Sequence, residues 1–268
     1  MSKSGVYETR KKDGSTYYRC SVTVKRKHIS LGSYATEDEA AAVYEEARAI
    51  IDGDPASLPE APVHLPYQKF ITLLNLKKNG VYFGNPIFLK KNFFEYHLSP
   101  DRILKFDRDD LFFYAAHRIQ LKGGYLFVCD YGSQYKILKR YGIRPFAVEG
   151  RDYLLINGDK NDYRYSNIRI LSNYTGVRAE YKGEEKSLVS GYTAVVHVNG
   201  DYIVGRYEAE ELAAIAYNKA VDILHKNGIK KNFITNYIER LSAAEYKEIY
   251  DSITISDKIS KLKPTHKL

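Results

Sequence analysis

The sequence predicts an α+β protein with two similar modules, each a three-stranded sheet followed by a helix, that flank a different middle region. Three observations lead to this prediction: one residue pattern occurs twice, strand-like segments alternate between apolar and polar side chains, and an alanine-rich helical segment follows each set of strands. The predicted boundaries are 1–55 and 174–235 for the two modules, 65–173 for the middle region, and 236–268 for a C-terminal helix and tail.

The repeat consists of two distant copies of one residue order. A Gly-Val pair opens each copy, and a Gly-x-Tyr triplet precedes each predicted helix. From Gly32 and Gly205 to Tyr44 and Tyr217, the two copies keep a constant offset of 173 residues. Glycines, tyrosines and alanines in one shared order indicate that both copies have the same fold.

Each element of the first copy has its own local pattern. Residues 18–24 alternate between apolar and polar side chains, which predicts a strand with one buried and one solvent-facing side. The basic run 25–27 marks a hairpin, and residues 28–31 continue the alternation. Thr36 and Glu39 have the spacing of a capping box at the start of a helix. Because the apolar stripe of that helix covers the inner face of the sheet, the polar and basic side chains lie on the outer face.

Both copies resemble the APETALA2-type DNA-binding domain of plant ethylene-response factors and phage integrases, over about 50 residues each. In that family the three-stranded sheet lies in the DNA major groove, and arginines and tryptophans of the sheet contact bases and phosphates. Most of these arginines and tryptophans are replaced in this chain. The resemblance therefore implies DNA binding by the sheet without implying the plant target sequence.

The matching positions and the basic runs together define a predicted DNA-contacting set in the first copy. Its members are Ser4, Tyr7, Thr9, Arg10, Lys11, Lys12, Arg19, Ser21, Thr23, Lys25, Arg26, Lys27, His28 and Ser30. In the second copy the predicted DNA-binding residues are Arg178 and His197, among outward positions that also include Glu180, Asp201 and Ile203. Residues 174–207 hold four basic and four acidic residues, so a structural or partner-binding role is the alternative for this copy.

Charge is distributed unevenly along the chain, which has 41 Lys and Arg against 33 Asp and Glu and a formal net charge of +8. Residues 65–173 hold 18 basic and 10 acidic residues. Residues 1–64 hold 9 and 10, but most of the basic ones precede Tyr34 and most of the acidic ones follow it. A basic sheet backed by an acidic helix is a stronger indication of a nucleic-acid partner than the net charge alone.

Composition excludes several classes of protein. Hydrophobic residues make up 44% and charged residues 28%, as in globular proteins. Two cysteines are too few for a disulfide scaffold or a cysteine-rich zinc site. No stretch approaches the roughly 18 apolar residues of a membrane span. We therefore expect a soluble cytoplasmic protein, associated with the nucleoid and not with a membrane.

Residues 153–171 resemble the core of HNH homing endonucleases, which phage and intron enzymes often join to APETALA2-type repeats. The shared features are a turn at Gly158-Asp159 and an Asn-Ile-Arg segment at 167–169. The resemblance implies a ββα fold for this core. Its phosphate-contacting residues would be the basic residues around the hairpin and turn, namely Lys136, Lys139, Arg140, Lys160, Arg164 and Arg169.

The residues that perform HNH chemistry are largely missing from this segment. A histidine base and a divalent metal held by histidine or aspartate are required. Leu154 and Leu155 stand where the paired histidines belong, Tyr163 aligns with the central asparagine, and Asn157 replaces the first aspartate of the turn. Leucine can neither accept a proton nor bind a metal. The resemblance thus implies a degenerate HNH core with no catalytic residues, no metal and no cofactor.

The C-terminal region begins with a predicted helix. Residues 241–250 have helical patterning, with Ser242 and Glu245 at capping-box spacing. Residues 258–268 are basic, and we expect them to be frayed.

Taken together, these patterns predict a non-catalytic, sequence-specific double-stranded DNA-binding protein of bacterial or phage origin. Its expected role is transcriptional regulation, by a protein derived from a homing endonuclease. One alternative is an active HNH-type endonuclease or nickase with rearranged catalytic residues, which would require His97 and His117 to meet near Asp107, Asp109 or Asp110. The other alternative is an adaptor that binds another protein.

Overall fold

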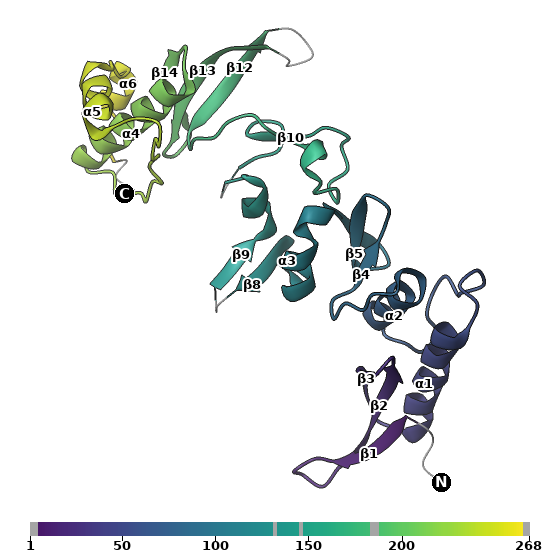
Figure 1. The fold of residues 1–268 in the computed structure, drawn as a ribbon. Coiled ribbons are helices and arrows are strands. Elements are labelled where there is room, and N and C mark those ends of the chain that lie inside the picture. Colours follow the sequence, from purple (N-terminus) through teal and green to yellow (C-terminus); the bar gives the residue numbers. More distant parts are fainter. Residues whose placement is uncertain (1–4, 131–132, 145–146, 183–187, 265–268) are drawn as a thin grey trace. The chain divides into compact units, whose positions relative to one another are not determined.

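The computed structural model describes residues 5–130, 133–144, 147–182 and 188–264. The chain divides into two compact units, of which unit 1 comprises Met1–Ile137 with Asp159–Tyr165 and unit 2 comprises Leu138–Gly158 with Ser166–Leu268. The described residues form six α-helices and five antiparallel sheets of two or three strands (Figure 1), which confirms the α+β class. No helix in these four ranges is long and apolar enough to cross a membrane.

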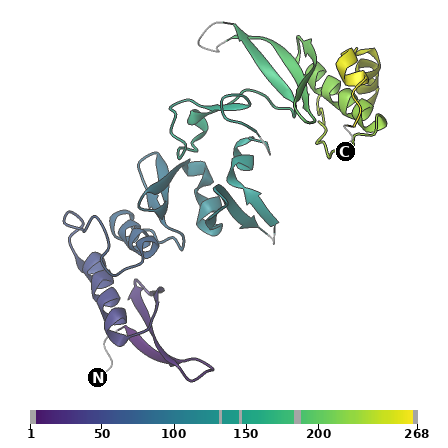
Figure 2. The same ribbon diagram turned by 180° about the vertical axis from the view of Figure 1, so that it is seen from behind.

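The first copy of the repeat forms a three-stranded antiparallel sheet and a helix. Its strands, in the order β1-β2-β3, are Val6–Arg10, Thr16–Val24 and Lys27–Tyr34, and α1 spans Glu37–Asp52. The helix covers one face of this sheet (Figures 1 and 2). The predicted capping box of α1 is confirmed, because the Thr36 side chain accepts from the backbone N–H of Glu39 and the Glu39 side chain accepts from that of Thr36.

Alternation in β2 and β3 sorts the side chains as the sequence predicts. Cys20, Val22, Ile29 and Leu31 are each at most 3% exposed and pack against the buried stripe of α1. The alternating polar side chains Arg19, Thr23 and His28 are exposed, whereas Ser21 is only 8% exposed. The outer face of this sheet is therefore the polar one.

The second copy repeats the same topology in unit 2. Its sheet has the order β12-β13-β14, with strands Val177–Lys182, Leu188–His197 and Asp201–Tyr207, and α4 spans Glu210–Lys226. Both sheets carry a bulge at the matching place, between Cys20 and Ser21 in β2 and between Ala194 and Val195 in β13.

Packing against tyrosine explains the glycines that the two copies share. Gly5 and Gly176 have left-handed φ angles of 74° and 72°. A Cβ atom at either glycine would collide with a helix ring, that of Tyr44 in the first copy and that of Tyr217 in the second. The carbonyl of Gly5 accepts from Ser21 at 3.0 Å, and that of Gly176 accepts from Val195 at 2.7 Å. The Gly-Val opening and the central helix tyrosine thus make the same contact in both modules.

Between the first module and the β10–β11 hairpin, the chain forms two α-helices and two further three-stranded sheets, β4-β5-β6 and β7-β8-β9. The bounds of these elements are α2 Tyr67–Asn79, β4 Ile87–Leu89, β5 Phe93–Ser99, β6 Arg102–Asp107, the 3-10 turn η1 Arg108–Asp110, α3 Leu111–Ala116, β7 Ile119–Lys122, β8 Tyr125–Asp130, β9 Ser133–Lys136 and the 3-10 turn η2 Ile137–Tyr141. Phe70 and Leu73 of α2 are fully buried in the same core as Val22. Helix α2 therefore extends the core of the first module.

A second core in unit 1 is aromatic. Phe94, Tyr96, Phe106 and Tyr114 are each at most 1% exposed. The rings of Phe106 and Tyr114 stack with centroids 4.2 Å apart, and Tyr163 stacks on the same Phe106 at 5.5 Å. The loop that contains Tyr163 is thereby attached to unit 1.

The segment that resembles an HNH core contains a two-stranded hairpin. Strands β10, Tyr153–Leu155, and β11, Ile168–Ile170, pair antiparallel, and the 3-10 turn η3, Tyr165–Asn167, precedes β11. The helix that a ββα core needs is absent from residues 171–176, all of which are described, and β12 follows directly. The ββα arrangement expected for this segment is therefore not confirmed.

The C-terminal region packs onto the second module. Helix α5 spans Ala243–Ser252, and its predicted capping box between Ser242 and Glu245 is confirmed. The prediction that residues 258–268 are frayed is wrong for the described part, because Asp257–Ser260 form α6 and Ile259 is fully buried. The buried Ile259 side chain attaches this basic segment to the core of the second module.

Candidate nucleic-acid interface

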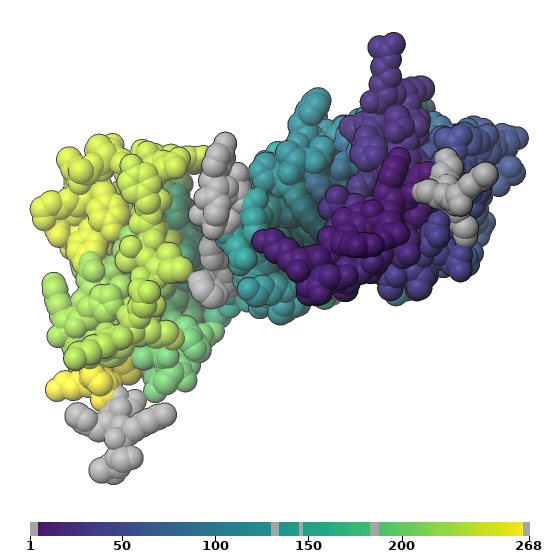
Figure 3. Space-filling view, turned by 90° about the horizontal axis from the view of Figure 1, so that it is seen from below, coloured from purple at the N-terminus to yellow at the C-terminus, as the bar shows by residue number. Residues whose placement is uncertain are grey.

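Six residues of the predicted DNA-contacting set line one hollow on the outer face of the first sheet. The hollow measures about 540 Å³ and is bordered by Tyr7, Thr9, Arg19, Ser21, His28 and Ser30, together with Cys20, Gly32 and Ser33. Strand register brings them together, because Tyr7 lies opposite Arg19 on β2, and Arg19 lies opposite Ser33 on β3. In Figure 3 the strands of this module, in dark purple, lie at the surface of the molecule.

The lining of this hollow is hydroxyl-rich and basic. Tyr7 is 57% exposed, and Arg19, His28 and Ser30 are exposed as well. The Arg19 guanidinium and the Lys11 ammonium each lie 5.9 Å from the ring centroid of Tyr17. No carboxylate of the described residues forms an ion pair with Arg19, so its charge is available to a ligand.

Basic side chains stand at both ends of β2. At one end, Lys11 and Lys12 are exposed in the turn that follows β1, and Arg10 forms a loose ion pair of 3.8 Å with Glu8. At the other end, Lys25 and Arg26 are the two central residues of the β2–β3 hairpin. Ser4 of the predicted set lies outside the described residues.

The β2–β3 hairpin has a left-handed backbone at two positions where asparagine and glycine are the usual residues. Lys25 and Arg26 have φ angles of 45° and 67°, and they are the only non-glycine residues with positive φ in the described chain. Two-residue hairpins with positive φ at both positions prefer Asn-Gly, because an L side chain in this region costs about 1–2 kcal/mol. Lys27 follows, with its ammonium 4.4 Å from the ring centroid of Tyr82. Three successive basic residues are thus retained at a strained turn.

The outer face of the second sheet has its charges paired. Arg178 forms an ion pair with Asp201, whose other oxygen bonds Nδ1 of His197 at 2.8 Å. Bonds from Arg178 and then from His197 lower the pKa of Asp201. Glu180 accepts from Arg206 at 3.1 Å and also bonds the Thr193 hydroxyl.

Ile203 of the same face is 53% exposed. The second sheet therefore offers a neutral and partly apolar face where the first offers free cations.

The basic residues predicted for the middle region are divided between the two units. Lys136, Lys160 and Arg164 belong to unit 1, whereas Lys139, Arg140 and Arg169 belong to unit 2. Within unit 1, the Lys136 ammonium lies 3.9 Å from the ring centroid of Tyr125.

Arg164 is held by its neighbours in the same unit. Its guanidinium donates two bonds, of 2.8 and 2.6 Å, to the fully buried carboxylate of Asp162, and it lies over the ring of Phe93. Arg164 thus has a structural role in the turn.

The polar residues of the turn in the HNH-like segment stabilise that turn. Asp159 accepts from the Lys105 ammonium at 2.9 Å and from the Asn161 backbone, and these bonds lower its pKa. The buried side chain of Asn167 accepts from the backbone N–H of Asn157 at 2.8 Å.

Leu154 and Leu155 lie on β10, opposite Arg169 and Ile168. At these two positions, where an HNH enzyme would need a base and a metal ligand, the chain has leucines.

The two histidines considered for a rearranged site have other partners. His97 bonds the Tyr67 hydroxyl at 2.8 Å and Glu95 at 3.3 Å. His117 bonds the Phe113 carbonyl at 2.8 Å and stacks on the ring of that residue. Across the described ranges, no three or more His, Cys, Asp or Glu side chains gather as metal donors.

Sequence reasoning missed two residues of the first sheet's outer face. Tyr17 has the same alternation parity as Arg19, so the sequence contained the signal that places it beside that side chain. Ser33 reaches the outer face only because the bulge at Cys20 and Ser21 shifts the register of β3. No sequence pattern marks that bulge in a single strand.

No protein-family model matches the chain, and comparisons with curated proteins and with solved structures give no match either.

Proposed function

We propose that this chain is a non-catalytic, sequence-specific double-stranded DNA-binding protein whose first sheet enters the major groove, as its resemblance to APETALA2-type domains implies. The observation that carries the proposal is the outer face of β1-β2-β3, where hydroxyl groups and unpaired cations lie together. Its role would be transcriptional regulation, by a protein that derives from an HNH homing endonuclease.

The arrangement of charge along β2 fits this mode of binding. Nine residues at a rise of about 3.3 Å separate the basic groups at its two ends by about 26 Å. The major groove is about 12 Å wide and accepts a two-stranded ribbon. Cations at both ends of the strand would contact phosphates on either side of the groove, while Arg19 and the hydroxyls between them would face base edges.

The proposal that binding occurs without cleavage follows from the chemistry of the side chains. Leu154 and Leu155 cannot take a proton or hold a metal, and Asp159 is engaged by Lys105. A supercoiled plasmid incubated with Mg²⁺ or Mn²⁺ is expected to stay intact. Metal-dependent nicking that Asp159→Ala or His117→Ala abolishes would support the nuclease alternative instead.

A salt titration of binding to a duplex of about 20 base pairs tests the DNA-binding proposal. If five cations of the first module contact phosphates, log K should fall with log salt at a slope of about −4.5. Affinity would then drop roughly 500-fold between about 50 and 200 mM salt. Arg19→Gln should weaken binding, whereas Lys247→Gln, which alters a surface lysine paired with Asp251, should leave it unchanged. A flat salt response, or equal effects of the two substitutions, would contradict the proposal.

A further inference from the structure

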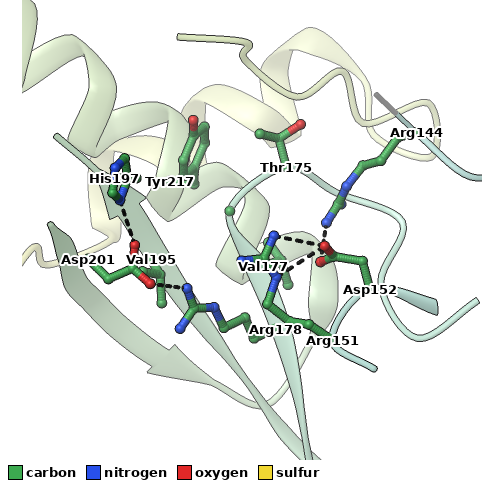
Figure 4. Close-up of a pocket in the computed structure, with 11 residues that line it drawn as sticks. Arg144, Arg151, Asp152, Thr175, Val177, Arg178, Val195, His197, Asp201 and Tyr217 are labelled. Carbon is green, nitrogen blue, oxygen red and sulfur yellow. Dashed lines mark hydrogen bonds and ion pairs between the residues drawn. The ribbon is translucent and has the colours of Figure 1, made fainter. Parts of the chain in front are cut away.

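Unit 2 contains a pocket of about 280 Å³ at the edge of the second sheet, lined by charged and apolar residues. Figure 4 shows that the loop before β10 contributes Arg144, Arg151 and Asp152, and that the sheet contributes Arg178, His197 and Asp201. Gly176 and the Tyr217 ring complete the wall. Three arginines from two chain segments thus line one cavity.

One wall of the pocket is a buried carboxylate shared by two guanidinium groups. Asp152 is 3% exposed and accepts from Arg144 at 2.8 Å, from Arg151 at 2.8 and 3.1 Å, and from the backbone of Val148 at 2.7 Å. Because two cations share one anion, this wall keeps a net positive charge.

Arg144 has donor capacity that the protein does not use. Its side chain is 17% exposed, and its Nη1 atom is buried without a hydrogen-bond partner among the described residues. Burial lowers the pKa of the Arg144 guanidinium, although Asp152 counteracts this effect. Leaving a buried charged donor unpaired is unfavourable, so the protein alone does not fully satisfy the Arg144 guanidinium, which lines this pocket.

The opposite wall adds a second charged group. Arg178, at the start of β12, pairs with Asp201, which also bonds His197. Asp201 is about half exposed, so a ligand can compete with it for the Arg178 guanidinium. Over the whole pocket, three arginines face two aspartates, and the net charge is positive even with His197 neutral.

We propose that this pocket binds a phosphate group, held by Arg144 and Arg151 on one side and by Arg178 on the other. Guanidinium forks match the oxygens of a phosphate, and donors on two sides suit a tetrahedral anion better than a planar carboxylate. The group is either a small phosphoester or free phosphate, or a phosphate of a nucleic-acid backbone. The inference goes beyond the proposed function, which requires only the first sheet.

Titration of the full-length chain with inorganic phosphate, at constant ionic strength in chloride, tests this inference by calorimetry. Phosphate is expected to bind with one site per chain. Arg178→Gln should weaken it at least tenfold, and this partly exposed position can be changed without disturbing the core. Arg144→Gln should have a similar effect. The matched control is Arg206→Gln, which removes the same charge from the same sheet face but lies outside the pocket, paired with Glu180.

The outcomes separate the two sources of phosphate. If phosphate competes with duplex DNA and Arg178→Gln lowers DNA affinity, the ligand is a backbone phosphate. If phosphate binds and DNA affinity is unchanged by Arg178→Gln, the ligand is a small phosphoester. The inference is overturned if no heat specific to phosphate is seen, or if Arg206→Gln weakens phosphate binding as much as Arg178→Gln. The two overturning results are measured with phosphate alone, so they do not depend on DNA binding by the first sheet. The Arg19→Gln variant measures that binding separately.

Discussion

The β2–β3 hairpin allows charge and strain to be separated by substitution. In the variant Lys25→Asn with Arg26→Gly, the turn receives the residues that its backbone prefers, and two cations are lost. Relief of left-handed strain is worth about 1–2 kcal/mol per residue, from which the extra unfolded-state entropy of glycine subtracts up to about 1 kcal/mol. The local free energy of unfolding should therefore rise by about 1 kcal/mol or more, while DNA affinity falls.

Two measurements check this prediction in the full-length chain. Hydrogen exchange of the amides in β2 and β3 should slow by roughly fivefold, the equivalent of about 1 kcal/mol. The salt slope of DNA binding should lose about 1.8 if both side chains contact phosphates. The control Lys25→Ala with Arg26→Ala removes the charge but retains the strain, so it should lower affinity without slowing exchange. Faster exchange in the Asn-Gly variant would refute the strain argument, and unchanged affinity would refute a role of the hairpin in DNA binding.

Three further predictions concern stability. Gly5→Ala should lower the free energy of unfolding by about 2–3 kcal/mol in urea titrations, since its new Cβ meets a tyrosine ring. Gly14→Ala, which has a similar φ but open space around it, should cost only about 1 kcal/mol, and equal effects would contradict the packing argument. The bond from Lys105 lowers the pKa of Asp159 in the folded chain. The stability that this bond contributes is therefore present above the ordinary aspartate pKa and is lost as the pH falls through the lowered pKa. Asp159→Asn should therefore show a smaller loss of stability on acidification than the parent chain, in denaturation curves from pH 7 to 3. Ser242→Ala removes a helix cap and should lower stability by about 1 kcal/mol, measured as a shift in the urea midpoint.

Features that depend on neighbouring residues were predictable from the sequence. The alternation in residues 18–24 determined which side chains of β2 are buried, and Thr36 with Glu39 marked the start of α1. Both are consequences of the periods of strand and helix, which act over a few residues. The repeat added a second module with the same order of elements, because the same glycine and tyrosine contacts recur in it.

Features that depend on segments far apart in the chain were decided only by the tertiary structure. The composition of the second sheet is the same whether its charges are paired or free. Only the folded sheet brings the Arg178 side chain from β12 to Asp201 on β14. Arg144 and Arg151 reach the edge of this sheet because their loop packs beside a strand that begins some 25 residues later. A charge pattern along the sequence determines which ions a chain carries, but the electrostatics of a surface depend on which of them become neighbours, and that is set by packing.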